Sequence, residues 1–172
     1  MNSRLDFIFS RRSIRKYENK DVPEETLHDL LEAGMAAPSA VAKDPWHFIV
    51  LRKRENIDKL AAVLPHGKML RQATAAFVVC GDIARTHDRK ESYMLQDLSA
   101  AVENILLAAN GLGLGTCWLG VHPRAERMEA IKKMFTLPET IIPMCAIAIG
   151  WPAEQPEPRT RFRQECVHME NW

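Results

Sequence analysis

The strongest constraint on the fold is a long helical pattern near the middle of the chain. Between about Tyr93 and Asn110, apolar residues recur with the period of an α-helix. The main apolar stripe consists of Leu95, Leu98, Val102, Ile105, Leu106 and Ala109, and it is widened by Ala100, Ala101 and Ala108. A stripe of this width predicts a central helix that other elements cover on most sides.

Shorter apolar segments before and after this helix predict a sheet. Strands are expected at residues 46–51, 75–80, 116–121 and 143–149, and further helices at residues 3–10, 23–34, 57–64 and 124–134. The alternation of strands and helices indicates a mixed sheet that is layered with helices. With 172 residues, the chain suits one domain over residues 1–172.

Composition and charge exclude several classes of protein. The chain carries 23 Lys and Arg against 22 Asp and Glu, for a net charge of +1, whereas a general nucleic-acid binder would be strongly basic. The apolar run Ile141–Ile149 is far shorter than the roughly 20 residues of a membrane span. The N-terminus lacks the apolar core of a signal peptide, and the four cysteines form no C-x-x-C pair. We therefore expect a cytoplasmic protein that binds neither nucleic acid nor membranes.

Common catalytic and metal-binding motifs do not occur in the sequence. It holds no G-x-S-x-G, H-E-x-x-H or P-loop pattern, and its six histidines are scattered singly, so we expect no metal site. Gly111, Gly113 and Gly115 follow the long helix and precede a strand. A dinucleotide-binding loop has the opposite order, so we interpret Gly111 as a helix terminator.

The clearest chemical signal is a cluster of arginines near the N-terminus. Within five positions the chain carries Arg11, Arg12, Ser13 and Arg15. The guanidinium group offers a fixed fork of donors that fits phosphate. A second cluster, Arg159 and Arg161, has the same chemistry near the C-terminus. The two clusters together favour a small anionic ligand, while charge alone leaves a solvated basic turn as the alternative.

The C-terminal segment 151–172 differs from the rest of the chain. It is rich in proline and shows neither a helical nor a strand period, which is typical of a frayed tail. It also carries the apolar residues Phe162, Val167, Met169 and Trp172. These anchors favour a tail that packs on another surface, with a second subunit as the candidate.

The order of several segments resembles the nitroreductase family of FMN-dependent oxidoreductases. Arg11–Tyr17 is similar to the N-terminal R-R-S-x-R-x-[FY] signature of that family. Ala37–Ala40, followed by Pro45–Phe48, resembles its A-P-S-x-x-N-x-Q-P-W-x-F segment. Leu112–Gly120 resembles its G-L-G-x-x-W-[IL]-G strand, and Ile147–Gly150 with the second arginine cluster resembles its closing strand and basic tail. These matches occur in the same order and run from about residue 10 to 163.

The resemblance implies an α+β fold with a central mixed, mostly antiparallel sheet flanked by helices, in an intertwined homodimer with FMN at the interface. Arg11, Ser13 and Arg15 would hold the FMN phosphate, ribityl chain and pyrimidine edge, with Arg12 sharing in this. Arg159 and Arg161 would complete the phosphate clamp. The remaining cofactor contacts would come from Pro38, Ser39 and Ala40 of the partner subunit and from Lys68, Trp118, Leu119 and Gly120. Segment 151–172 would embrace the partner.

The implied activity is electron transfer from NADH or NADPH to a small acceptor, such as a nitroaromatic, quinone or flavin, in a ping-pong cycle. The flavin supplies this chemistry, so we expect no essential catalytic side chain. We expect Arg11 to be the cation near N1 and the C2 carbonyl of the flavin. The alternatives are other flavin chemistry, namely alkene reduction or substrate dehydrogenation, a flavin-binding module without turnover, and a different phosphorylated ligand.

The sequence departs from the family pattern in one segment. Ala42 stands where the family usually has Asn, and Asp44 stands where it has Gln. The lost amide would normally form a hydrogen bond near the flavin ring, and the new carboxylate could instead pair with Lys43. The electron acceptor and the flavin potential therefore stay open. The chain is also short for the family, which predicts an open site without a long helical lid.

Overall fold

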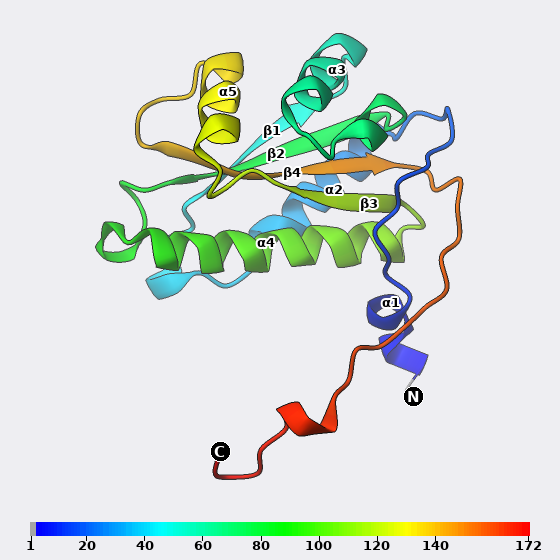
Figure 1. The fold of residues 1–172 in the computed structure, drawn as a ribbon, viewed down its shortest axis with the longest axis vertical. Coiled ribbons are helices and arrows are strands. Elements are labelled where there is room, and N and C mark those ends of the chain that lie inside the picture. The colour runs from blue at the N-terminus through cyan, green and yellow to red at the C-terminus, as the bar shows by residue number, and fades with distance from the viewer. Residues whose placement is uncertain (1–2) are drawn as a thin grey trace.

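The computed structural model describes residues 3–172 and shows a four-stranded sheet between two layers of helices (Figure 1). The strands are β1 (Trp46–Leu51), β2 (Ala75–Asp82), β3 (Gly115–Gly120) and β4 (Ile141–Gly150). They lie in the order β1-β2-β4-β3, and every neighbouring pair is antiparallel. The parallel element of the expected mixed sheet is a single bridge between Ser13 and Thr116.

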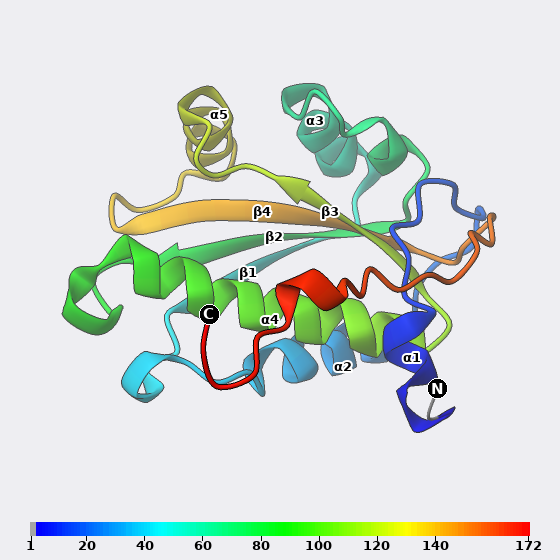
Figure 2. The same cartoon turned by 60° about the horizontal axis from the view of Figure 1, so that its bottom comes forward.

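Two pairs of helices cover the two faces of the sheet. Helices α2 (Glu24–Met35) and α4 (Glu91–Gly111) lie on one face, as Figure 2 shows from a second side. Helices α3 (Arg54–Val63) and α5 (Ala125–Phe135) lie on the other. The short helix α1 (Asp6–Phe9) lies outside these layers. Five 3-10 segments complete the described elements: Ser3–Leu5, Ala40–Ala42, Lys68–Arg71, His87–Arg89 and Gln164–Cys166.

The central strands are apolar throughout because helices cover both of their faces. In β2, Ala76, Val78 and Cys80 face the core under α3 and α5. The alternate residues Phe77 and Val79 face the core under α2 and α4. Successive side chains of a strand point to opposite faces, so a strand buried on both sides reads as a continuous apolar run.

The long helix agrees with its sequence pattern. Helix α4 buries Met94, Leu98, Val102 and Ile105 against the sheet and α2. It ends at Gly111, and the left-handed residue of the following turn is Gly113, with φ of 77°. The glycines therefore form a helix end, as expected. Helix α3 begins at Arg54, three residues before the expected Ile57, because its first turn is polar and gives no apolar period.

The N-terminal segment lies along the outer edge of β3. The backbone N–H of Ile14 donates to the carbonyl O of Thr116 at 2.9 Å, and Tyr17 forms an antiparallel bridge with Pro152. Close approach is possible because Gly115 has no side chain: a Cβ there would lie 2.8 Å from the Cβ of Ile14. This pairing places the basic segment beside β3.

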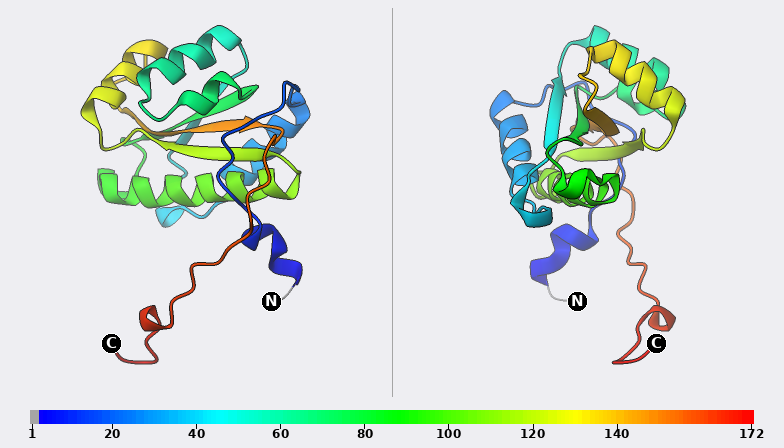
Figure 3. Two further views of the ribbon diagram at one scale, coloured as in Figure 1. Left: turned by 45° about the vertical axis from the view of Figure 1, so that its right-hand side comes forward. Right: turned by 90° about the vertical axis from the view of Figure 1, so that its left-hand side faces the viewer.

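After β4 the C-terminal segment first pairs with the N-terminal segment at Pro152 and Ala153, and the rest of the tail then leaves the body of the chain (Figure 3). Residues 159–172 are all exposed, among them Phe162 and Trp172. Within residues 3–172, the apolar anchors of the tail are therefore exposed to solvent. Within the described residues, no helix is both long enough and apolar enough to cross a membrane.

Candidate functional site

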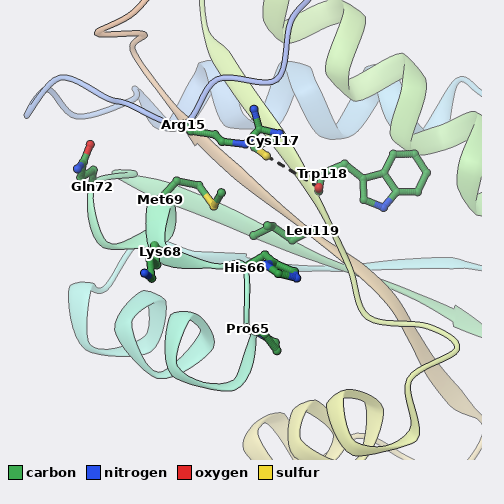
Figure 4. A pocket seen from close by; sticks show the side chains of 9 residues that line it. All are labelled: Arg15, Pro65, His66, Lys68, Met69, Gln72, Cys117, Trp118 and Leu119. Carbon is green, nitrogen blue, oxygen red and sulfur yellow. Dashed lines mark hydrogen bonds between the residues drawn. The ribbon is translucent and has the colours of Figure 1, made fainter.

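A cavity of about 640 Å³ lies between the N-terminal segment, the 3-10 segment Lys68–Arg71 and strand β3 (Figure 4). Its volume is in the range of small-molecule sites, about 300–1,000 Å³. Four residues expected from the sequence line it: Arg15, Lys68, Trp118 and Leu119. They come from three separate parts of the chain, which the packing against β3 brings together.

Two cations lie on the wall of this cavity. Among residues 3–172, neither Arg15 nor Lys68 lies within ion-pair distance of a carboxylate. The Arg15 side chain donates a long hydrogen bond of 3.4 Å from Nη1 to the carbonyl O of Ser13. Its backbone N–H donates to the Glu154 carboxylate at 2.5 Å, which fixes the main chain. The guanidinium and ammonium groups therefore keep donors available for an electron-rich ligand.

The free edge of β3 supplies backbone donors. Cys117 and Leu119 pair with β4, and the backbone N–H of Val121 continues this pattern by bonding to Met144. Hydrogen-bonding direction alternates along an antiparallel strand, so Trp118 and Gly120 direct their backbone groups to the open edge. The carbonyl O of Gly120 there accepts a hydrogen bond of 2.8 Å from Arg127.

Burial keeps the Cys117 thiol and the Tyr17 hydroxyl, both near the cavity, in their neutral forms. Burial raises the pKa of the Cys117 thiol, and Glu154 adds to this effect while Arg15 opposes it. Burial also raises the pKa of Tyr17 far above its ordinary value, and its hydroxyl donates to the carbonyl O of Ile14 at 2.7 Å. Away from the cavity, burial raises the pKa of Cys80 to about 12. The site thus contains no thiolate nucleophile and no tyrosinate base.

Arg11 and Arg12, also expected to contact the cofactor, do not line the cavity within the single chain. The Arg11 guanidinium lies 3.7 Å from the Glu103 carboxylate on α4, which engages its charge. Arg12 lines a separate hollow with Ile14, and its Nε is buried without a hydrogen-bond partner. In an extended segment, alternate side chains point to opposite sides, which separates Arg12 and Ile14 from Arg15.

Pro38, Ser39 and Ala40 also lie outside the cavity in the single chain. The backbone N–H of Ala40 donates to Asp97 on α4 at 2.8 Å. The carboxylate of Asp44 accepts a hydrogen bond from the Ser39 hydroxyl, so it pairs with Ser39 and not with Lys43. The following residues Val41 and Ala42 adopt left-handed φ values of 54° and 52°, which are costly for residues with a Cβ.

Of the other residues expected to contact the cofactor, two lie next to the cavity and two lie on the tail. Ser13 bridges to Thr116, and Gly120 ends β3 beside the cavity. Arg159 and Arg161 lie on the exposed tail and do not line the cavity within one chain. Further lining residues were not among the expected contacts: Pro65, His66, Met69, Gln72 and Cys117. Cys117 lies in the Leu112–Gly120 segment, whereas the other four lie around Lys68 and form no motif that could have identified them.

Comparison with known proteins identifies relatives of this chain in sequence and in fold. The model of the nitroreductase family matches residues 8–151. A protein of Methanothermobacter thermautotrophicus, provisionally named NADH dehydrogenase/NAD(P)H nitroreductase, is 45% identical over 98% of this chain and 87% of its own length. A crystal structure of a protein with the same provisional name, from Bacteroides thetaiotaomicron, is 43% identical. It superposes with a TM-score of 0.93 over 100% of this chain and 99% of the other.

A third relative adds information on a ligand. A protein from Desulfovibrio desulfuricans, solved in complex with FMN, is 32% identical and superposes with a TM-score of 0.85. The alignment covers 100% of this chain and 99% of that chain. The family match over most of the sequence, the close relatives and the shared fold lead to one conclusion: the chain belongs to the nitroreductase family.

Proposed function

We propose that this protein is an FMN-dependent oxidoreductase that transfers electrons from NADH or NADPH to a small acceptor. The observation that carries the proposal is the cavity in which Arg15 and Lys68 face the edge strand β3. Membership of the nitroreductase family supports it. So do relatives named FMN reductase [NAD(P)H], from Bacillus subtilis, and FMN-dependent nitroreductase, from Clostridium difficile.

The residues present fit FMN. Its pyrimidine edge is rich in electrons and matches the unpaired cations Arg15 and Lys68. The free backbone donors of Trp118 and Gly120 suit the polar atoms along the ring edge, and Leu119 offers apolar contact. When bound, FMN supplies the two-electron chemistry, and the protein supplies binding, orientation and electrostatics.

Arg15 and Lys68 would hold the pyrimidine edge and stabilise the negative charge that develops there. Fixed positive charges beside a developing negative charge are effective because they need no reorganisation. This assignment replaces the expectation for Arg11, whose guanidinium faces Glu103. No side chain needs to act as acid or base, which agrees with the raised pKa values of Cys117 and Tyr17.

The phosphate clamp would require a second copy of the chain. Arg159 and Arg161 lie on the exposed part of the tail, and Phe162 in the same part is 71% exposed. Burial of such anchors favours association by about 1.5–3 kcal/mol per large side chain. In a homodimer, the tail and the segment Pro38–Ala40 of one copy would complete the site of the other.

The cavity is open to solvent, and we expect both NAD(P)H and the electron acceptor to enter it. The two would bind there one after the other, which suits a ping-pong cycle with a nitroaromatic, quinone or flavin as the acceptor. The chain has no long helical lid within residues 3–172, so acceptors of different shapes could enter.

The deciding experiment is a visible absorption spectrum of the purified protein, followed by anaerobic addition of NADH or NADPH. We expect a yellow protein that is bleached by one of the two donors and reoxidised by a quinone or nitroaromatic. A yellow protein that neither donor bleaches would favour other flavin chemistry or a binding module without turnover. A colourless protein that takes up no added FMN would refute the proposal.

A further inference from the structure

A second hollow adjoins the cofactor cavity. It has a volume of about 520 Å³ and lies between the end of α3 and the start of α5. Its lining includes Val63, Pro65, Pro123, Arg124, Glu126 and Arg127. Pro65 lines both the cavity of about 640 Å³ and this second hollow, so the two adjoin at this residue. Figure 4 shows Pro65 on the side of the cavity nearer to α5 and away from Arg15.

Two arginines give this second hollow a positive wall. Arg124 is exposed, whereas Arg127 is half-buried and donates from Nη1 to the carbonyl O of Gly120 at 2.8 Å. Glu126 contributes one carboxylate to the lining. In the part of the chain that the structure describes, however, neither arginine lies within ion-pair distance of a carboxylate. Most of their N–H donors are therefore available to an anion.

The start of α5 adds to this positive potential. Arg124 is its N-cap residue and forms no side-chain cap hydrogen bond. The backbone N–H groups of Arg127 and Met128 bond to the carbonyl O of Arg124, and those of the two preceding residues lie outside this ladder. The first N–H groups and the dipole of a helix favour a negative group at this end. The start of α5 and the two arginine side chains thus all favour a negative group in this hollow.

We infer that this second hollow binds a phosphate of the nicotinamide dinucleotide whose ring enters the cofactor cavity. The inference rests on the proposed function, because that function makes the first cavity the place where hydride is transferred. The dinucleotide carries its negative charge on phosphates, and arginine forks fit phosphate better than lysine does. The proposed FMN phosphate clamp uses Arg159 and Arg161 of a second copy of the chain, so the two anions would not compete for Arg124.

Two phosphates could provide this chemistry, namely the pyrophosphate of both donors and the 2′-phosphate of NADPH alone. ADP serves as the probe for the first, and adenosine 2′,5′-bisphosphate serves as the probe for the second. Both are titrated calorimetrically against the FMN-loaded and the flavin-free protein. The parent is compared with Arg124→Ala and with Arg85→Ala, which removes an equally exposed charge that lines neither hollow.

We expect Arg124→Ala to weaken binding of at least one probe by about fivefold, as for an exposed charge contact, while Arg85→Ala leaves it unchanged. The charge reversal Arg124→Glu should weaken it further, and added salt should reduce the difference. In turnover, Arg124→Ala should raise the KM for the matching donor without changing kcat. A loss for the bisphosphate alone would identify the 2′-phosphate, and a loss for ADP would identify the pyrophosphate.

Equal affinities of Arg124→Ala and Arg85→Ala for both probes would overturn the inference. The two hypotheses can fail separately. Uptake and bleaching of FMN without any effect at Arg124 would reject only the phosphate site. A flavin-free protein that takes up no FMN but loses probe affinity in Arg124→Ala would reject the proposed function and support a phosphate site.

Discussion

Arg15 reaches the cavity because segment 11–17 is extended and its side chains alternate between two sides. Arg12 and Ile14 line a separate hollow on one side of the segment, whereas Arg15 lines the cavity of about 640 Å³ on the other. Its backbone N–H is fixed by Glu154, and its guanidinium has no carboxylate partner among residues 3–172. At the residue scale, the charge available to a ligand is therefore set by which side of the segment a residue occupies.

Replacing Arg15 should lower FMN affinity. We expect Arg15→Ala to raise the dissociation constant of FMN by about tenfold or more, since a charge-assisted hydrogen bond contributes about 1.5–3 kcal/mol. Titration of the apoprotein, followed by quenching of flavin fluorescence, measures this constant. Lys16→Ala is the matched control, because it removes one positive charge at the next residue, outside the cavity lining. Equal affinity of the two variants would contradict the role of Arg15.

At the scale of elements, the site depends on how closely the N-terminal segment lies against β3. Gly115 faces Ile14, and Gly150 on the paired strand faces Tyr17, where a Cβ would lie 2.9 Å from Cδ1 of the ring. These two glycines let a buried isoleucine and a buried tyrosine lie directly on the sheet. The position of Arg15 between them follows from this close packing.

A side chain at residue 115 should push this segment away. We expect Gly115→Ala to reduce the free energy of unfolding by about 1–3 kcal/mol, because the new Cβ would overlap with Ile14. FMN affinity should fall with it. Gly111→Ala is the control, since no heavy atom lies within 4 Å of its added Cβ. Urea unfolding at fixed protein concentration and an FMN titration are carried out on both variants. Equal stability of Gly115→Ala and Gly111→Ala would contradict the close packing of Ile14 against residue 115.

At the scale of the whole molecule, one chain provides only part of the proposed site. The tail arginines and the segment Pro38–Ala40 lie away from the cavity, and the tail exposes Phe162, Met169 and Trp172. Val41, beside Ala40, is exposed as well as strained. A second copy would cover these groups and bring them to the cofactor.

Removal of the tail should therefore weaken association. We expect deletion of residues 160–172 to shift sedimentation from dimer towards monomer and to lower FMN retention. Phe162→Ser should have a smaller effect in the same direction, since burial of one aromatic side chain contributes about 1.5–3 kcal/mol. Glu157→Ser, an exposed polar position before the arginines, is the control. A truncated protein that sediments as an intact dimer would reject the embracing tail.

Much of the secondary structure could be read from local patterns. The four strands occur where continuous apolar runs predict them, and α4 matches its stripe within a few residues at each end. The start of α3 was missed because Arg54–Asn56 is polar and gives no apolar period. Of the residues that line the cavity, the sequence indicated Arg15, Trp118 and Leu119 through motifs, and Lys68 only through its position in the family resemblance.

Local periodicity and residue type are enough to predict most of the helices and strands, the family resemblance and the cationic chemistry. The folded chain was needed to show which arginine faces the cavity, which residues complete its wall, and that Arg124 and Arg127 form a second positive hollow beside it. These features depend on contacts between residues far apart in the chain, and on the side of each backbone to which a side chain points. Neither is encoded in the spacing of a motif.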